Sequence, residues 1–178
     1  EGVGQTNNAT EAYRRISRAY PDAAQSRKAL LSLALADMKA GRGANAVDSY
    51  QEIIRRWPSS EEAQMANDDL RRWHASQGTL SEYAEFLKSV PGAKQLDADE
   101  MEQLAFDGAE TAFADDASAT TLLRNYVRNY PDGKYLAQAL LDIAISLRDS
   151  GKYAEAQSTL ERLMKERPHS AQYPEALL

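Results

Sequence analysis

The sequence predicts an all-α fold built from repeated antiparallel helix pairs, and three observations support this expectation. Ala, Leu, Glu and Arg are abundant while Val, Ile and Thr are sparse, a balance that favours helices over strands. Five of the six prolines recur at intervals of 37, 33, 40 and 37 residues. Large apolar residues recur at fixed distances before those prolines. A period of this length is typical of solenoids in which each repeat is one supersecondary unit.

Prolines and glycines mark the same repeat independently. The recurring prolines are Pro21, Pro58, Pro91, Pro131 and Pro168. Gly41, Gly78 and Gly151 each follow one of these prolines by 20 residues, and Asp115-Asp116 stand in place of the fourth glycine. Because two kinds of residue keep the same period, the chain is interpreted as a repeat array.

The segment before each proline is predicted to be the buried second helix of a pair. Ala stands twelve residues before the proline as Ala9, Ala46, Ala119 and Ala156, with Thr79 in the remaining copy. The column eight residues before the proline contains Tyr13, Tyr50, Tyr83, Leu123 and Leu160. The column five residues before it contains Ile16, Ile53, Phe86, Tyr126 and Leu163. At this spacing the three columns lie on one helical face.

The first helix of each pair precedes the turn glycine and carries apolar residues at i, i+3 and i+4, as in Leu30, Leu33 and Ala34. Helix starts are predicted where a capping acceptor stands three residues before a Glu, at Asn8, Ser59, Thr79 and Asp97. These signals together predict helices at 9–20, 24–40, 44–56, 61–77, 80–89, 98–113, 117–129, 134–150, 153–166 and from 171 onward.

We expect one array over residues 1–178, because the same period runs through the whole chain. Its units are 9–20, which is a second helix only, then 24–57, 61–90, 98–130 and 134–167, and finally 171–178, which starts a further unit. An array that begins with a lone second helix and ends inside a first helix leaves its end faces uncovered. We therefore expect this chain to be a fragment of a longer array.

The charge distribution argues against nucleic acid as a partner. The net charge is −6 and the pI is about 5.0, whereas binding to a phosphate backbone requires a surplus of Lys and Arg. Between Lys94 and Arg124 there are eight acidic residues and no basic one. This acidic segment is either a solvated helix face with a loop or an attractor for a basic partner. No apolar run is long enough for a membrane span.

The sequence contains few residues suited to catalysis, and we expect no enzyme activity, no metal and no cofactor. Cysteine is absent, and the only histidines, His74 and His169, are too few for a histidine metal site or a Ser-His-Asp arrangement. His74 is interpreted as a packed helix residue and His169 as a linker residue. Asp107 and Glu110 share a helical face, but carboxylates at this spacing are far more often surface residues than an acid–base pair.

The order of a turn glycine, an alanine, a large residue and a closing proline resembles the tetratricopeptide repeat. In "GKYAEAQSTLERLMKERP" the matching residues are Gly151, Ala156, Leu160 and Pro168, and "GRGANAVDSYQEIIRRWP" repeats the pattern from Gly41. The period exceeds the usual 34 residues, and the extra residues follow the proline, as in "NYPDGKYLAQAL". This insertion is similar to the tyrosine-proline variant of the repeat in bacterial envelope proteins, such as outer-membrane assembly lipoproteins and Tol-Pal-associated periplasmic proteins. The resemblance implies a right-handed superhelical solenoid of about four repeats with partial end units.

The resemblance further implies a noncatalytic scaffold that binds a protein or peptide on its concave face, in the periplasm or at the outer membrane of a Gram-negative bacterium. A cytoplasmic location and a role as helical spacer in a larger envelope enzyme or secretion machine are the alternatives. The first helices would line the concave face with Lys28, Leu31, Leu35, Met38, Met65, Asp68, Arg72, Ala75, Gln138, Leu141, Ile145 and Arg148. These residues could equally contact further repeats, and the sequence specifies no oligomeric state.

Overall fold

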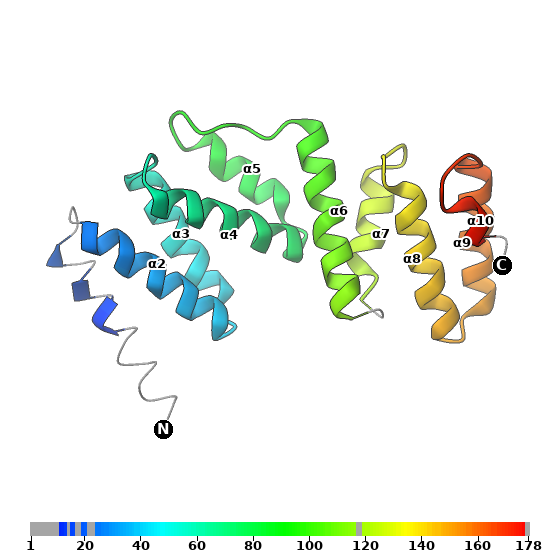
Figure 1. Cartoon of the computed structure of the whole chain (residues 1–178), viewed down its shortest axis with the longest axis horizontal. Coiled ribbons are helices and arrows are strands. Elements are labelled where there is room, and N and C mark those ends of the chain that lie inside the picture. The colour runs from blue at the N-terminus through cyan, green and yellow to red at the C-terminus, as the bar shows by residue number, and fades with distance from the viewer. Residues whose placement is uncertain (1–10, 14, 17–18, 21–23, 117–118, 177–178) are drawn as a thin grey trace, which may run out of the picture. The chain divides into compact units, whose positions relative to one another are not determined.

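The computed structural model of the protein describes residues 11–13, 15–16, 19–20, 24–116 and 119–176, and these residues are predominantly helical with no strand among them (Figure 1). Asn8, Ala9, Pro21 and part of the predicted helix 9–20 lie outside the described residues. The remaining helices follow the predicted order: α2 (Ala24–Lys39), α3 (Gly43–Arg56), α4 (Glu61–Gln77), α5 (Leu80–Lys88), α6 (Ala98–Asp115), α7 (Thr121–Asn129), α8 (Leu136–Asp149), α9 (Tyr153–Glu166) and α10 (Tyr173–Ala176).

The main difference from the predicted boundaries lies at the start of α7. The sequence predicts a helix from residue 117, but Asp116 adopts an extended conformation and α7 begins at Thr121. Ala119 N donates to Asp116 O at 2.8 Å. Ala119 and Thr120, which the periodicity assigns to the helix, precede it, and residues 117 and 118 of the predicted helix lie outside the described residues.

The described residues fall into two compact units. Unit 1 lies within Glu1–Trp73 and Tyr83–Gln95, and unit 2 lies within His74–Glu82 and Leu96–Leu178. α2 and α3 pack together in unit 1, while α6 with α7, α7 with α8, α8 with α9, and α9 with α10 pack together in unit 2. Each unit is therefore built from sequential neighbours, as repeat architectures are. The continuous array over residues 1–178 stays a prediction.

The predicted caps are only partly correct. Asp97 caps α6 in a full capping box, since its carboxylate accepts from Glu100 N at 2.8 Å and its own N–H donates to the Glu100 carboxylate at 3.1 Å. At α4 the prediction of Ser59 is wrong: the hydroxyl that accepts from Ala63 N belongs to Ser60, which directly precedes the helix. The Thr79 hydroxyl instead lies 2.8 Å from His74 Nδ1.

The predicted turn glycines close the first helices. Gly41 and Gly151 have φ values of 71° and 75°, a left-handed conformation that residues with a Cβ seldom adopt. In both turns the residue after the glycine donates back to the helix, from Arg42 N to Asp37 O and from Lys152 N to Leu147 O at 2.8 Å each. The chain reverses there and the second helix begins within two residues.

In unit 1 a tyrosine of the second helix anchors the next first helix. Tyr50 and Ile53 of α3 are fully buried, as the columns predict, and so is Leu70 of α4. The Tyr50 hydroxyl donates to the Asp69 carboxylate at 2.9 Å. Burial and the neighbouring Asp69 carboxylate raise the pKa of Tyr50, so the hydroxyl remains a donor.

In unit 2 the Tyr126 hydroxyl connects three helices. It donates to Glu102 of α6 at 2.7 Å and accepts from the backbone N–H of Tyr135, at the start of α8, at 3.0 Å. The Glu102 carboxylate also accepts from Lys134 N at 2.5 Å. The ring of Tyr135 stacks on Phe106 at a centroid distance of 4.5 Å. These contacts fix the entry of α8 onto the α6–α7 pair.

A close helix crossing within unit 2 depends on a glycine. A Cβ built on Gly108 of α6 would lie 2.5 Å from the carbonyl oxygen of Ala75 and 3.0 Å from its Cβ. Gly108 is buried, and the neighbouring Ala109 is fully buried. The backbones of α6 and the last turn of α4 therefore approach as closely as only glycine allows.

Candidate functional site

The first helices of unit 1 present part of the predicted binding face. In α2, Lys28 is exposed, Leu35 is 38% exposed and Met38 is half-buried, whereas Leu31 is buried in the packing of the helix. An ion pair of 3.2 Å between Arg27 and Glu62 joins α2 to α4. α2 and α4 are therefore neighbouring first helices whose exposed apolar side chains are interspersed with charges.

The matching face of α4 is more polar. Met65 is 52% exposed, and Asp68 and Arg72 are exposed beside it along the helix. Arg72 forms an ion pair with Asp69, and Asp68 pairs with Arg71 at 3.4 Å. Ala75, which the sequence places on the same face, is buried against α6 in unit 2.

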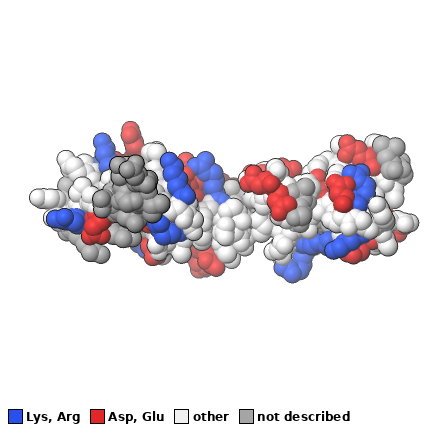
Figure 2. Space-filling view, turned by 90° about the horizontal axis from the view of Figure 1, so that it is seen from below, with Lys and Arg blue, Asp and Glu red and all other residues white. Residues whose placement is uncertain are grey.

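Basic and acidic side chains are mixed over the surface of each unit. On the face shown in Figure 2, Lys and Arg occur together with Asp and Glu in both units. Several charged side chains of the described residues form ion pairs within a helix, such as Arg56 with Glu52 and Lys88 with Glu85. Exposed pairs of this kind contribute little to stability.

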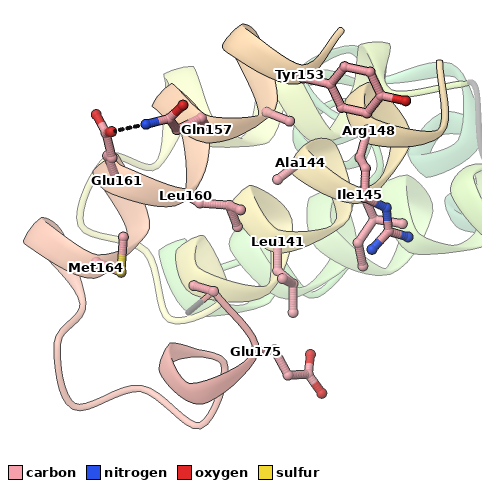
Figure 3. A pocket seen from close by; sticks show the side chains of 12 residues that line it. Leu141, Ala144, Ile145, Arg148, Tyr153, Gln157, Leu160, Glu161, Met164 and Glu175 are labelled. Atoms are coloured by element: carbon pink, nitrogen blue, oxygen red, sulfur yellow. Dashed lines mark hydrogen bonds between the residues drawn. The ribbon is translucent and has the colours of Figure 1, made fainter. Parts of the chain in front are cut away.

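In unit 2 the predicted residues of α8 meet α9 in an apolar groove. Leu141 is buried at the floor, Ile145 is half-buried and Arg148 is exposed at one end (Figure 3). This α8/α9 groove has a volume of about 670 Å³. Its lining consists of Leu141, Ala144, Ile145, Arg148, Tyr153, Ala156, Gln157, Leu160, Glu161, Met164, Glu175 and Ala176. Three predicted binding residues are thereby brought together, while Gln138 lies outside the groove and is half-buried.

Sequence reasoning missed the α9 side of this groove. It assigns the whole apolar face of the second helix to the core, and Leu163 is indeed fully buried. Leu160 and Met164 are only half-buried, however, and Tyr153 is 70% exposed. These three large side chains lie on the helix that directly follows α8, and α8 carries apolar residues at positions predicted to be exposed. That combination is the sequence signal that could have identified the groove.

Charges flank the groove without entering its floor. Arg148 pairs with Asp149 at 3.0 Å, and Gln157 donates to Glu161 at 2.9 Å. Glu175 of α10 also lines the groove, apart from Arg148 (Figure 3). The groove therefore offers an apolar floor with charged side chains of both signs along its edge.

Asp142 follows Leu141 on α8 and is buried. Burial raises the pKa of this carboxyl, the Gln138 amide that donates to it at 2.9 Å opposes the shift, and Glu110 and Glu175 reinforce it. A buried acid with this set of neighbours holds its proton more readily than an exposed one. In the described part of the chain its hydrogen-bonding partner is the Gln138 amide and not a second carboxylate, so it does not form an acid–base pair there.

The remaining candidates for chemistry have structural surroundings. His74 is buried beside Thr79, which agrees with its interpretation as a packed helix residue, and burial lowers its pKa. His169 is exposed after α9. Asp107 and Glu110 are exposed, and Asp107 accepts from the Gln103 amide at 2.7 Å. In the described part of the chain, no three His, Asp or Glu side chains are grouped so that they could hold a metal ion.

One further correction concerns the first described helical residues. Ile16 belongs to a column predicted to be buried, but it is 37% exposed. Together with Ala12 and Ala19 it lines an open apolar surface, so its side chain lacks the cover that Ile53 and Leu163 have. In addition, none of the described helices is long and apolar enough to cross a membrane.

Comparison with known families gives two matches. Two sequence models described as "Tetratricopeptide repeat" match residues 2–61 and 138–170. The second match begins in α8, includes all of α9 and ends at Ser170, so it contains both walls of the α8/α9 groove. A search of curated proteins found no match.

Proposed function

Because this chain belongs to the tetratricopeptide-repeat family, whose members generally mediate protein–protein interaction, we propose that it is a scaffold for polypeptide partners. The partners would bind on the concave face lined by the first helices, as the resemblance implies. Such a role requires surface complementarity and needs no reacting group. We accordingly propose a noncatalytic function.

The observation that carries this proposal is the α8/α9 groove. It joins Leu141 and Ile145 of the predicted face to Leu160 and Met164 of α9 in one apolar surface. Exposed, contiguous apolar surface with charged edges is typical of interaction sites in otherwise polar proteins. In unit 1, Leu35 and Met65 add exposed apolar side chains on first helices.

We further propose that the scaffold acts in the envelope of a Gram-negative bacterium, at the outer membrane or in the periplasm. The support for this location is the resemblance of the insertion after the proline to envelope repeat proteins. Fractionation of source cells, followed by immunodetection of the native protein, tests the location directly. Recovery in the cytoplasmic fraction would reject it and leave the scaffold proposal intact.

Charge reversal on the first helices tests the binding face. The chain is used as bait in extracts of its own source, and the captured proteins are identified by mass spectrometry. We expect Arg72→Glu and Arg148→Glu to reduce stoichiometric capture, because both side chains are exposed on this face. Their ion pairs with the adjacent Asp69 and Asp149 are at the surface, so helicity should not change.

Lys88→Glu on α5 is the matched control, since this lysine is exposed on a second helix and pairs with Glu85 at 2.6 Å. Capture that survives both arginine reversals, or that falls equally with the Lys88 variant, would reject the first-helix face as the binding surface. If the wild-type chain captures no partner at all, the spacer role within a larger envelope machine becomes the better explanation.

A further inference from the structure

A separate pocket lies in unit 1, where the C-terminal ends of α3 and α5 meet the first turns of α4. Its floor is apolar, because Ile54, Ala63, Leu87 and Val90 are only 3–5% exposed. The pocket has a volume of about 420 Å³, which lies within the range of roughly 300–1,000 Å³ typical of ligand pockets. None of its lining residues belongs to the predicted concave face. This α3/α5 pocket is therefore a surface of its own.

One wall of the α3/α5 pocket is the segment that follows α5, and hydrogen bonds hold this segment in place. Val90 N donates to Leu87 O and Ala93 N donates to Val90 O, each at 3.1 Å. The Gln95 side-chain amide donates to the carbonyl oxygens of Leu87 and Ala93, also at 3.1 Å each. Gly92 supplies the positive φ of 77° in this turn. The wall is fixed by contacts within unit 1, so the pocket is preformed.

The corresponding place in unit 2 contains an arginine. Val90 and Arg167 are the residues directly before their recurring prolines, and Pro58 corresponds to Pro131 one pair earlier in each unit. Arg167 is half-buried, and its guanidinium donates to the carbonyl oxygens of Pro131 at 3.4 Å and Glu166 at 3.1 Å. Val90 carries no such donor. Within the described residues of unit 1, this column therefore leaves the Pro58 carbonyl oxygen without one.

The helix ends around the α3/α5 pocket favour a cation. α3 ends at Arg56 and α5 ends at Lys88, just before the residues that line the pocket, and the C-terminal end of a helix carries partial negative charge. The N-terminal end of α4 has the opposite sign, but the Ser60 hydroxyl accepts from Ala63 N there at 3.1 Å. Among the lining residues only Lys94 is charged, and it is exposed, so solvent screens its repulsion of a second cation.

We propose that the α3/α5 pocket receives an arginine side chain of a partner polypeptide. The aliphatic part of the arginine packs on Ile54, Leu87 and Val90, as long basic side chains do on apolar surface. Its guanidinium donates to the Pro58 carbonyl oxygen, as Arg167 does to the corresponding carbonyl in unit 2. The inference rests on the proposed scaffold function, because the arginine belongs to a polypeptide, and it adds a contact outside the concave face.

Titration with single amino-acid derivatives tests this inference. The ¹⁵N-labelled chain 1–178 is titrated with N-acetyl-arginine amide, and backbone chemical shifts are followed by NMR. We expect saturable shifts centred on Val90, Gly92 and Ala93, with a dissociation constant in the millimolar range that suits one side chain. N-acetyl-citrulline amide has nearly the same shape without the charge, and it should bind about threefold more weakly or not at all.

Two variants locate the binding. Val90→Arg places the missing guanidinium in the chain itself and should abolish the shifts, with circular dichroism as the check on folding. Lys94→Ala changes an exposed side chain and keeps the test valid if the first variant unfolds. It removes a like charge from the lining, so the arginine derivative should bind about twofold more tightly. Lys88→Ala is the matched control, because this exposed lysine does not line the pocket and its loss should leave the affinity unchanged.

Three results would overturn the inference. The first is the absence of shifts around the pocket, and the second is equal binding of the arginine and citrulline derivatives. The third is preferred binding of N-acetyl-glutamate amide that Lys94→Ala weakens, which would identify an acidic side chain as the occupant. None of these results bears on the scaffold proposal, which would stand if capture from extracts still depended on Arg72 and Arg148.

Discussion

Replacing Gly108 with alanine tests the helix crossing of unit 2. The added Cβ would lie 2.5 Å from the Ala75 carbonyl oxygen and 2.6 Å from its carbonyl carbon. Ordinary contact begins at 3.4 Å, so the shortest of these distances falls roughly 0.9 Å short. A backbone carbonyl cannot rotate away as a side chain can. The α6 helix must therefore move, and the buried Phe106 and Ala109 must move with it.

Two opposing effects determine the magnitude. Alanine is favoured over glycine within a helix by about 1 kcal/mol, which would stabilise the variant. Overpacking a close contact costs roughly 1–3 kcal/mol and more where backbone must shift. The steric cost wins, and we expect Gly108→Ala to lower the free energy of unfolding by about 1–2 kcal/mol. For a chain of this size the melting temperature should fall by roughly 2–8 °C.

The assay is thermal unfolding followed by far-UV circular dichroism and calorimetry. Thr111→Ala is the matched control, because it adds helix propensity at an exposed position of the same helix and creates no close contact. It should change stability by only a few tenths of a kcal/mol. A melting temperature of Gly108→Ala at or above the wild-type value would refute the close crossing at Ala75.

Three further predictions concern buried polar groups. Tyr126→Phe should cost about 1–3 kcal/mol in denaturant titrations, because Glu102 loses a donor and Tyr135 N–H loses its acceptor; an unchanged midpoint would contradict this. Burial raises the pKa of Asp142, so the folded protein retains a proton that the unfolded chain releases. The free energy of unfolding therefore falls as pH rises from about 4 through the pKa that Asp142 has in the folded protein. Asp142→Asn should therefore raise the melting temperature at pH 7, and a lower value would count against this reasoning. Burial lowers the pKa of His74, so the unfolded chain binds the proton first and stability falls as pH drops below about 6.5. His74→Gln should flatten the melting temperature between pH 7 and 5 relative to wild type, and parallel curves would contradict the assignment.

The helix pairs could be predicted from sequence because burial is encoded locally in each of them. Tyr50, Ile53 and Leu163 are fully buried at positions that periodicity alone identifies. The turn glycines follow from the need for positive φ between two helices, which Gly41 and Gly151 satisfy. Such features depend on a residue and its neighbours within a few turns, which a single sequence displays.

The α8/α9 groove could be predicted only in part, because exposure depends on what covers a residue. Leu123 and Leu160 occupy the same column and have the same side chain, yet one is fully buried and the other lines the groove. Similarly, nothing in the residues around Gly108 specifies that Ala75, 33 positions earlier, lies against it. These are properties of the packed structure, and the periodicity of one helix does not contain them.

The tyrosine hydroxyls of the two units have a consequence for how the protein opens. Tyr50 joins the α2–α3 pair to α4, and Tyr126 joins the α6–α7 pair to the start of α8. In each unit, therefore, one pair cannot loosen without breaking a bond to the next helix in line. An array of linear repeats unfolds less cooperatively when the stabilising contacts between neighbouring repeats are weak. Amide hydrogen exchange should consequently show one shared slow rate for the best-protected amides of α3 and α4, and another for those of α7 and α8, rather than a graded fraying from pair to pair.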